Sequence, residues 1–159
     1  MSVRQVIVDH GFDAIITEMK NAKHRYVKVG FPLEKEAAPG ELAGMPEVTL
    51  VAMVQEFGSE KRNIPERPFI RGAFDANYTD LQAFKEAEFL QVMQGKQTAD
   101  TGIRRIGEWM VNKTKAYIKA IIPPPNAPTT IARKHSTTPL IDTGQMINSI
   151  QYAVTSSKE

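Results

Sequence analysis

The chain has 159 residues, 42% hydrophobic and 24% charged, and it contains no cysteine. A chain of this length buries about 70% of the surface that its unfolded form exposes, so one domain can hold its own core. The lack of cysteine excludes a disulfide framework, thiolate metal sites, iron–sulfur clusters and a thiol nucleophile. Apolar runs are only a few residues long, so the sequence predicts neither a membrane span nor a secretory signal.

Charge is unevenly distributed along the chain. Its 20 Lys and Arg and 18 Asp and Glu give a net charge of +2, yet the segment 101–135 holds seven basic residues and a single Glu, a net +6 that leaves −4 elsewhere. Clustered Lys and Arg can face nucleic-acid phosphates or an acidic protein neighbour. We favour a solvated or subunit-facing surface and keep nucleic acid as the alternative.

The N-terminal part predicts one helix and one strand. Apolar residues between Val6 and Met19 fall on one helical face, and the alternation over Tyr26–Phe31, closed by Pro32, is typical of a strand. The segment 34–47 is rich in Glu, Ala, Gly and Pro and has little to bury, so we expect a loop insert there.

The middle of the chain predicts mostly helix. We expect a short helix over Thr49–Phe57 with Gly58 after it, an extended connector over Asn63–Phe69, which contains two prolines, and a helix over Leu81–Met93. The clearest helix is Thr101–Ile121, where apolar residues recur every three or four positions. Three prolines then end it.

The C-terminal part predicts an extended arm, a short helix and a strand. The arm covers 126–139, is polar and basic, and has too few apolar residues to pack alone. Asp142 or Thr143 is expected to cap a helix around Met146, and Gln151–Val154 suits a strand. Together these elements predict a single α+β domain, with several helices packed on a short, mostly antiparallel sheet.

One string has the look of a catalytic loop. Leu140-Ile141-Asp142-Thr143-Gly144 is similar to the loop of retroviral-type aspartic proteases, in which two such carboxylates share a proton. Only 15 residues follow Gly144, too few for the rest of that fold, so we interpret Asp142 and Thr143 as capping residues.

The sequence offers little support for a metal or nucleotide cofactor. His10, His24 and His135 lack the i, i+4 spacing of a helix-borne metal site, and no glycine-rich loop has the Lys-Ser/Thr of a phosphate-binding turn. Trp109 and Tyr117 lie among basic residues and could stack on bases, although a core stripe explains them better. We therefore expect no catalytic residue and no cofactor.

Three strings together resemble one family. They are Glu56-Phe57-Gly58, then Ile64-Pro65-Glu66-Arg67-Pro68-Phe69-Ile70-Arg71, and finally Thr130-Ile131-Ala132-Arg133-Lys134 followed by Pro139-Leu140-Ile141-Asp142-Thr143-Gly144-Gln145-Met146 and Ser149-Ile150. Their order, between about Thr49 and Val154, resembles the neck and tail-completion proteins of long-tailed bacteriophages and prophages, also described as minor tail or virion morphogenesis proteins. The insert at 34–47 has no counterpart in that pattern.

The resemblance implies a structural virion protein. Such a protein is a small α+β subunit that forms a ring, with six subunits the expected number, at the junction of head and tail. It is assembled in the host cytoplasm, and its partners are further copies of itself and the neighbouring tail and head-connector proteins, with weak, sequence-independent contact to channel DNA. A tail-terminator ring, a basic non-specific DNA-binding protein and, least favoured, a protease are the alternatives.

Five residues are expected at the contact between subunits. Arg67 and Arg71 could bridge to carboxylates of a neighbour, because guanidinium groups pair well with carboxylates. Phe69 could anchor that contact or fill the core of its own subunit, and the sequence does not separate the two. Arg133 and Lys134, on the predicted arm, complete the set.

Overall fold

The sheet joins segments that are far apart in the sequence. The computed structural model describes residues 11–31, 47–120, 123–134 and 137–156. Strand β1 (Arg25–Gly30) pairs antiparallel with β2 (Gln151–Ser156), and the register runs from Arg25 opposite Ser156 to Gly30 opposite Gln151. The alternation of partly buried and exposed residues along both strands shows that one face of this ribbon is covered.

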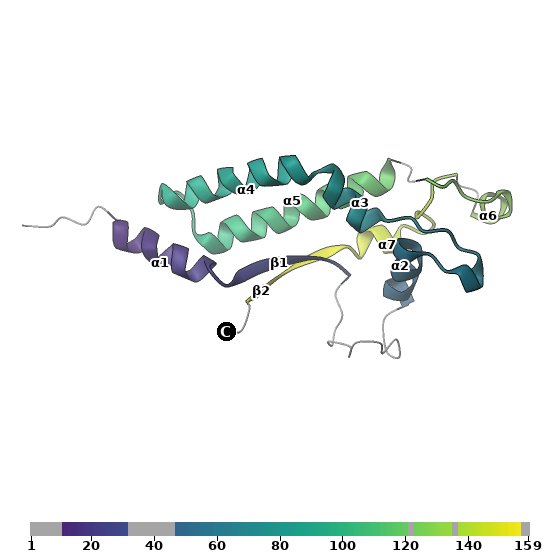
Figure 1. Ribbon diagram of the computed structural model, residues 1–159, viewed down its shortest axis with the longest axis horizontal. Coiled ribbons are helices and arrows are strands. Elements are labelled where there is room, and N and C mark those ends of the chain that lie inside the picture. The colour runs from purple at the N-terminus through teal and green to yellow at the C-terminus, as the bar shows by residue number, and fades with distance from the viewer. Residues whose placement is uncertain (1–10, 32–46, 121–122, 135–136, 157–159) are drawn as a thin grey trace, which may run out of the picture.

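Helix α5 (Ala99–Lys119) is the element against which most others pack (Figure 1). Helix α4 (Tyr78–Met93) lies alongside α5, and the turn that joins the two helices contains Gly95, whose φ is 67°. The β ribbon crosses the other side of α5, and α3 (Phe69–Ala76) packs near its C-terminal half. The apolar residues along α5 therefore pack against several neighbouring elements.

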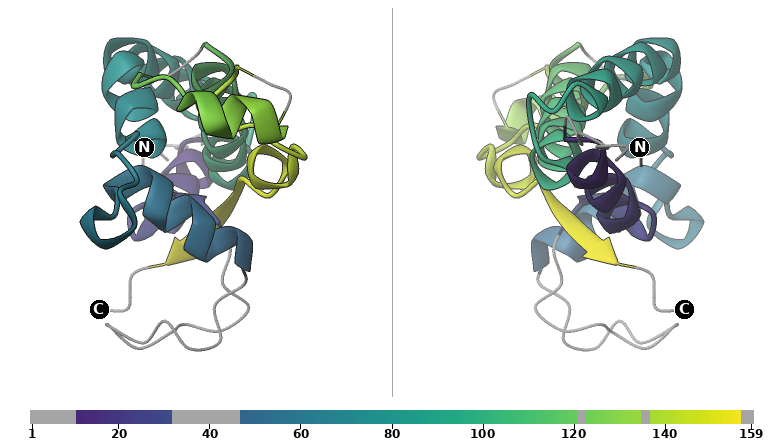
Figure 2. Two further views of the ribbon diagram at one scale, coloured as in Figure 1. Left: turned by 90° about the vertical axis from the view of Figure 1, so that its right-hand side faces the viewer. Right: turned by 90° about the vertical axis from the view of Figure 1, so that its left-hand side faces the viewer.

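Shorter helices complete the fold at its two ends, as Figure 2 shows in end-on views. They are α1 (Phe12–Ala22), α2 (Glu47–Phe57), α6 (Pro128–Lys134) and α7 (Gln145–Asn148), with a single 3₁₀ turn at Glu60–Arg62. The predicted α+β class is confirmed: within the described residues, seven helices pack with a two-stranded antiparallel sheet in one domain.

The core lies between α5 and the segments that cross it. Its main cluster is formed by buried side chains of five elements or their flanks: Ala52, Phe69, Val111, Ile118, Met146, Ile147 and Ile150. A second cluster joins Ala73 and Leu81 to Met110 of α5. Phe69 and Ile118 are fully buried, so α3 and α5 are held together by side chains that are closely packed on all sides.

The N-terminus of α5 fixes the neighbouring elements by hydrogen bonds. Thr98 caps the helix by accepting from the Thr101 N–H, and Glu18 of α1 accepts from the Ala99 N–H at 2.7 Å. Asp100 pairs with Arg104 at 2.6 Å and with Arg25 of β1. The Arg104 guanidinium, followed by that of Arg25, holds the pKa of the Asp100 carboxyl below its ordinary value.

Most predicted elements are confirmed, with shifts at their ends. Strands at 26–31 and 151–154 and helices at 49–57, 81–93 and 101–121 each coincide with an observed element. The predicted N-terminal helix is observed from Phe12 onward, and its first part lies outside the described residues, as does the insert at 34–47 except for Glu47, where α2 begins.

Two predictions of extended chain are wrong. Phe69 is predicted to end a connector, but it is the first residue of α3. Pro68 has no side chain that can cap this helix, and Glu56 of α2 accepts the hydrogen bonds of the first N–H groups instead. The arm at 126–139 contains α6, which begins at Pro128, a residue whose fixed φ suits the first helical turn. None of the described helices is long and apolar enough to span a membrane.

Replacement of Gly107 by Ala should destabilise the protein, although Ala favours a helix by about 1 kcal/mol. An added Cβ would lie 2.5 Å from Cδ2 of the Tyr152 ring, so α5 and β2 must separate, and overpacking of this kind costs about 1 to 3 kcal/mol. We expect a net loss in urea-unfolding experiments. In the Tyr152→Ala background the same substitution should cost much less, because the ring is gone and only the Cβ of residue 152 lies close, at 3.1 Å. A gain in the unmodified chain would contradict this close approach.

The Asp100 contacts should weaken in acid. Because the folded-state pKa is lowered, the unfolded state binds protons more readily, so this contribution to stability is complete above about pH 4, the ordinary Asp pKa, and is lost as the pH falls through the folded-state value. Asp100→Asn should therefore lower stability at pH 6 and make little difference at pH 2. A stability difference that is independent of pH would contradict the proposed pairing.

Candidate functional site

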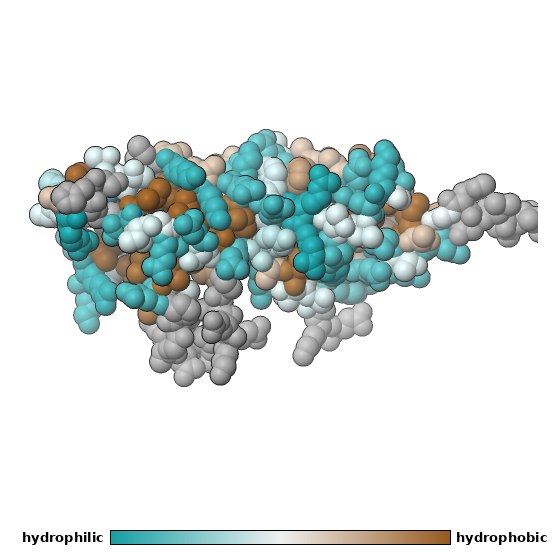
Figure 3. Space-filling view, turned by 180° about the vertical axis from the view of Figure 1, so that it is seen from behind, coloured by the Kyte–Doolittle hydropathy of each residue, from teal (hydrophilic) through white to brown (hydrophobic). Residues whose placement is uncertain are grey.

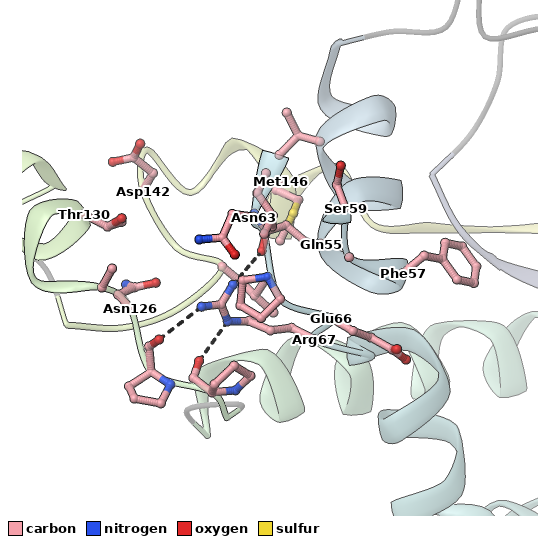
Figure 4. Close-up of a pocket in the computed structure, with 18 of the residues that line it drawn as sticks. Gln55, Phe57, Ser59, Asn63, Glu66, Arg67, Asn126, Thr130, Asp142 and Met146 are labelled. Carbon is pink, nitrogen blue, oxygen red and sulfur yellow. Dashed lines mark hydrogen bonds between the residues drawn. The ribbon is translucent and has the colours of Figure 1, made fainter. Parts of the chain in front are cut away.

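A groove of about 1500 Å³ opens at the end of the molecule that carries α2 and α6. Its walls are α2, the loop through the 3₁₀ turn, the segment 124–127, the arm and the start of α7 (Figure 4). Hydrophobic side chains reach the surface at this end, on the left in Figure 3. Val51 and Phe57 of α2 line the groove and are 45% and 63% exposed.

The buried carboxylate of Glu56 lies beside this groove and fixes the start of α3. It accepts the Ile70 and Arg71 N–H groups, at 2.9 and 3.1 Å, and so caps α3 in place of Pro68, which bears no capping side chain. Gly58 follows with a φ of 73°, and a Cβ there would lie 2.9 Å from the Glu66 N. The string Glu56-Phe57-Gly58 thus encodes a cap and a tight turn.

Arg67 ties the two walls together (Figure 4). Its guanidinium donates to the carbonyl oxygens of Pro124 and Pro125, at 2.9 and 3.2 Å, and to Gln55 Oε1 at 3.1 Å, while its backbone N–H bonds the Gln55 carbonyl. The residue is only 6% exposed, and burial lowers the pKa of its guanidinium. Arg67 is therefore an internal brace, whereas the sequence analysis expects it at a contact between subunits.

Arg71 and Phe69 are likewise engaged inside the chain. Arg71 Nε pairs with Glu56 at 3.0 Å, Nη2 pairs with Glu66, and the guanidinium lies 5.2 Å from the Phe57 ring centroid. Half of the Arg71 side chain is still exposed. Phe69 is fully buried in the main core cluster, so of the two alternatives for this residue the core role is confirmed.

Of the two residues predicted to cap α7, Thr143 bonds the start of the helix and Asp142 does not. The N-cap of α7 is Gly144, with a φ of 80°, and the Thr143 hydroxyl accepts from the Gln145 N–H at 3.3 Å. Asp142 is exposed on the groove and caps no described helix. Leu140 has a φ of 64°, a left-handed conformation that is costly for Leu. The string Leu140-Ile141-Asp142-Thr143-Gly144 therefore has an unusual backbone conformation where it borders the groove.

Arg133 and Lys134 lie on α6 and not on an extended arm. Arg133 is exposed, lines the groove and makes no ion pair with any described residue. The Lys134 side chain is outside the described part of the structure. The Asn126 amide also lines the groove, and its Nδ2 is buried without an acceptor among the described residues. A bound partner could supply that acceptor.

Much of the basic surface of α5 is neutralised within the chain. Arg104 pairs with Asp100 at 2.6 Å, Arg105 with the buried Glu88 at 3.4 Å, and Lys113 with Asp80 at 3.6 Å. These pairings lower the positive potential that a phosphate backbone would meet.

Trp109 packs inside the subunit. Its ring stacks on that of Phe84, with centroids 5.4 Å apart and planes 13° from parallel, and the Lys113 ammonium lies 5.0 Å from its centroid. Tyr117 lies against both core clusters. The core interpretation of these two aromatic residues is therefore confirmed.

The described residues contain no group of three or more His, Asp or Glu side chains that could hold a metal ion. His10 and His135 lie outside them. Comparison of the chain with protein-family models, with curated proteins and with solved structures found no match.

Sequence reasoning missed the partners that make this site. The strings at 56–58 and 64–71 were recognised, but the cap from Glu56 to α3 and the bonds from Arg67 to the Pro124 and Pro125 carbonyls were not. The sequence does carry a signal for the start of α3. Pro68 precedes Phe69 and Ala73, an apolar pair at i, i+4 spacing, and this pattern can mark a helix start. Backbone carbonyl acceptors leave no such signal.

Replacement of Arg67 by Lys should open the groove and cost about 2 to 3 kcal/mol of stability. A single ammonium cannot reach three acceptors on two walls, and buried acceptors left without a donor are costly. Arg62→Lys, in the exposed 3₁₀ turn, is the matched control and should change the free energy of unfolding by less than about 0.5 kcal/mol. Equal effects of the two substitutions would contradict the bracing role.

Proposed function

We propose that this chain is a structural subunit of the junction between head and tail in a long-tailed bacteriophage or prophage particle, where it forms a ring around the DNA channel. One observation carries the proposal: all three strings that resemble the family meet at the groove. Glu56 bonds α3 and Arg71. The groove itself is lined by Phe57, Arg67 and Arg133, one residue from each of the three strings.

The groove has the properties of a protein contact. Exposed Val51 and Phe57 offer apolar area. Among the described residues, Arg133 has no ion-pair partner and the buried Asn126 amide donor has no acceptor. Contacts that combine an apolar centre with a few oriented polar groups are typical of protein interfaces. These properties support the rim of the groove as the proposed assembly surface, with the internal residues Arg67, Phe69 and Arg71 holding that rim in shape.

The proposed role is non-enzymatic and requires no cofactor. Asp142 offers a single exposed carboxylate, whereas aspartic protease chemistry needs two that share a proton. The ion pairs of α5 favour weak, sequence-independent contact with channel DNA over tight binding. A tail-terminator ring remains the second candidate, because such a ring has the same kind of subunit and site.

Electron microscopy of particles assembled without the protein tests this role. In the phage or prophage that encodes the chain, its deletion should give filled heads and separate tails of normal length. Overlong tails would show the terminator role instead. Normal infectious particles would refute both.

Substitutions on the groove rim test the assembly surface. Val51→Asp combined with Arg133→Glu should give a folded subunit that fails to join heads to tails, because a charge enters the apolar centre and the rim charge is reversed. Arg62→Glu, exposed but outside the groove, is the control and should assemble normally. Far-ultraviolet circular dichroism would show that both variants fold, and normal joining by the rim variant would place the contact elsewhere.

A further inference from the structure

Each strand of the β ribbon has an edge that no other segment of the described chain pairs with. Within the described residues the sheet consists of β1 and β2, and no backbone hydrogen bond there joins either strand to a third segment. In an antiparallel pair, every second residue points its N–H and C=O groups away from the partner strand. Both outer edges therefore present main-chain donors and acceptors, and β2 runs along the outside of the molecule in the right-hand view of Figure 2.

The outer edge of β2 lacks the features that usually protect a free strand. Natural edge strands are kept from pairing by charged side chains, proline, a bulge or a very short length. Strand β2 has six residues, none of which is charged, Pro or Gly, and its register with β1 is uninterrupted. Strand β1 differs, because it carries Arg25 and Lys28. An unprotected edge of this length indicates a strand that is paired on both sides in the assembled protein.

We infer that the outer edge of β2 binds the outer edge of β1 of a second copy of this chain, in the register that the two strands have within one chain. The side chains of these strands already fit one another. On the exposed face, Ala153 lies opposite Lys28 and Thr155 opposite Tyr26, so this register sets no like charges together.

The same register can serve both edges of β2. A residue that exchanges hydrogen bonds with its partner on one side forms a non-hydrogen-bonded pair on the other side, and the two kinds of pair alternate along the strand. If a residue of β2 bonds the β1 residue opposite to it, that β1 residue also points its main-chain groups inward. The pair that these two positions form between copies is then a non-hydrogen-bonded pair, as the geometry requires.

Pairing of β2 with β1 uses both edges of every copy. A two-fold contact between two β2 edges would leave the β1 edges open, whereas the β2 to β1 contact is head-to-tail and leaves no free edge once the copies close into a ring. Closure into a ring rests on the proposed function. The dimensions allow it, because α5 packs on both strands and a helix about 10 Å wide matches two strands that are about 4.8 Å apart.

Cysteine cross-linking between copies tests the contact, since the chain has no cysteine of its own. Copies with Ala153→Cys are mixed with copies with Lys28→Cys, and both positions are exposed, so the variants should fold. Facing Cα atoms of paired strands are about 4.5 to 5.5 Å apart, within disulfide range. Oxidation of the mixture should give a covalent dimer, and neither variant alone should give one.

A mixture of Ala153→Cys with Arg62→Cys is the matched control for random collision, because Arg62 is exposed in the 3₁₀ turn. The strand mixture should give at least about tenfold more covalent dimer, since a contact holds the two thiols at a high effective concentration. An equal yield would overturn the inference. Strong cross-linking by Ala153→Cys alone would also overturn it, because it would show a two-fold contact between β2 strands.

Hydrogen exchange of the unmodified chain measures the edge directly. In the monomer every second amide of β2 should exchange rapidly, and in the assembled protein all of the β2 amides should be protected. Alternate rapid exchange that persists in the assembly would overturn the strand contact, as would a chain that stays monomeric up to about 100 µM.

The strand contact and the proposed function fail in different ways. Rings that join heads to tails while the β2 edge still exchanges rapidly would refute the strand contact and support the proposed function. A strand cross-link in a chain whose deletion leaves normal infectious particles would support the strand contact and refute the proposed function.

Discussion

The fold of the groove depends on one buried carboxylate. Glu56 closes the N-terminus of α3, where a proline leaves two N–H groups without a capping side chain, and it also holds Arg71. With α3 fixed, Phe69 enters the core and the Arg67 guanidinium points at the carbonyls of the 124–125 segment. An unpaired carboxylate at this depth would be costly, so cap, core and brace form together.

The elements that follow a strong hydrophobic period were predictable. Helix α5 and strand β1 show it clearly in the sequence, and both are observed within about two residues of their expected bounds. Helices α3 and α6 were not predicted, because each is short and its stability comes from contacts outside itself. For α3 the decisive partner, Glu56, is 14 residues from Ile70, and for α6 the polar composition hides any apolar face.

The contacts that shape the candidate site are less predictable from the sequence than its location. The sequence strings point to the region and predict that Arg67 and Arg71 bridge to carboxylates of a neighbouring subunit, whereas in the structure each is bonded within the chain. A sequence records which groups carry charge and not which acceptors the fold brings to them, and here two of the acceptors of Arg67 are backbone carbonyls. The same limit applies to α5, whose basic residues meet Asp80 and Glu88 only in three dimensions.

The pairing of β1 with β2 has a consequence for synthesis of the protein. Arg25 lies opposite Ser156, so a ribosome must translate nearly all of the described chain before the ribbon can close. The hairpin of α4 and α5 uses only local contacts and can form earlier, with the Gly107 side of α5 bare until Tyr152 arrives. A prematurely terminated chain would keep this apolar surface exposed and would be open to proteolysis and chaperone binding.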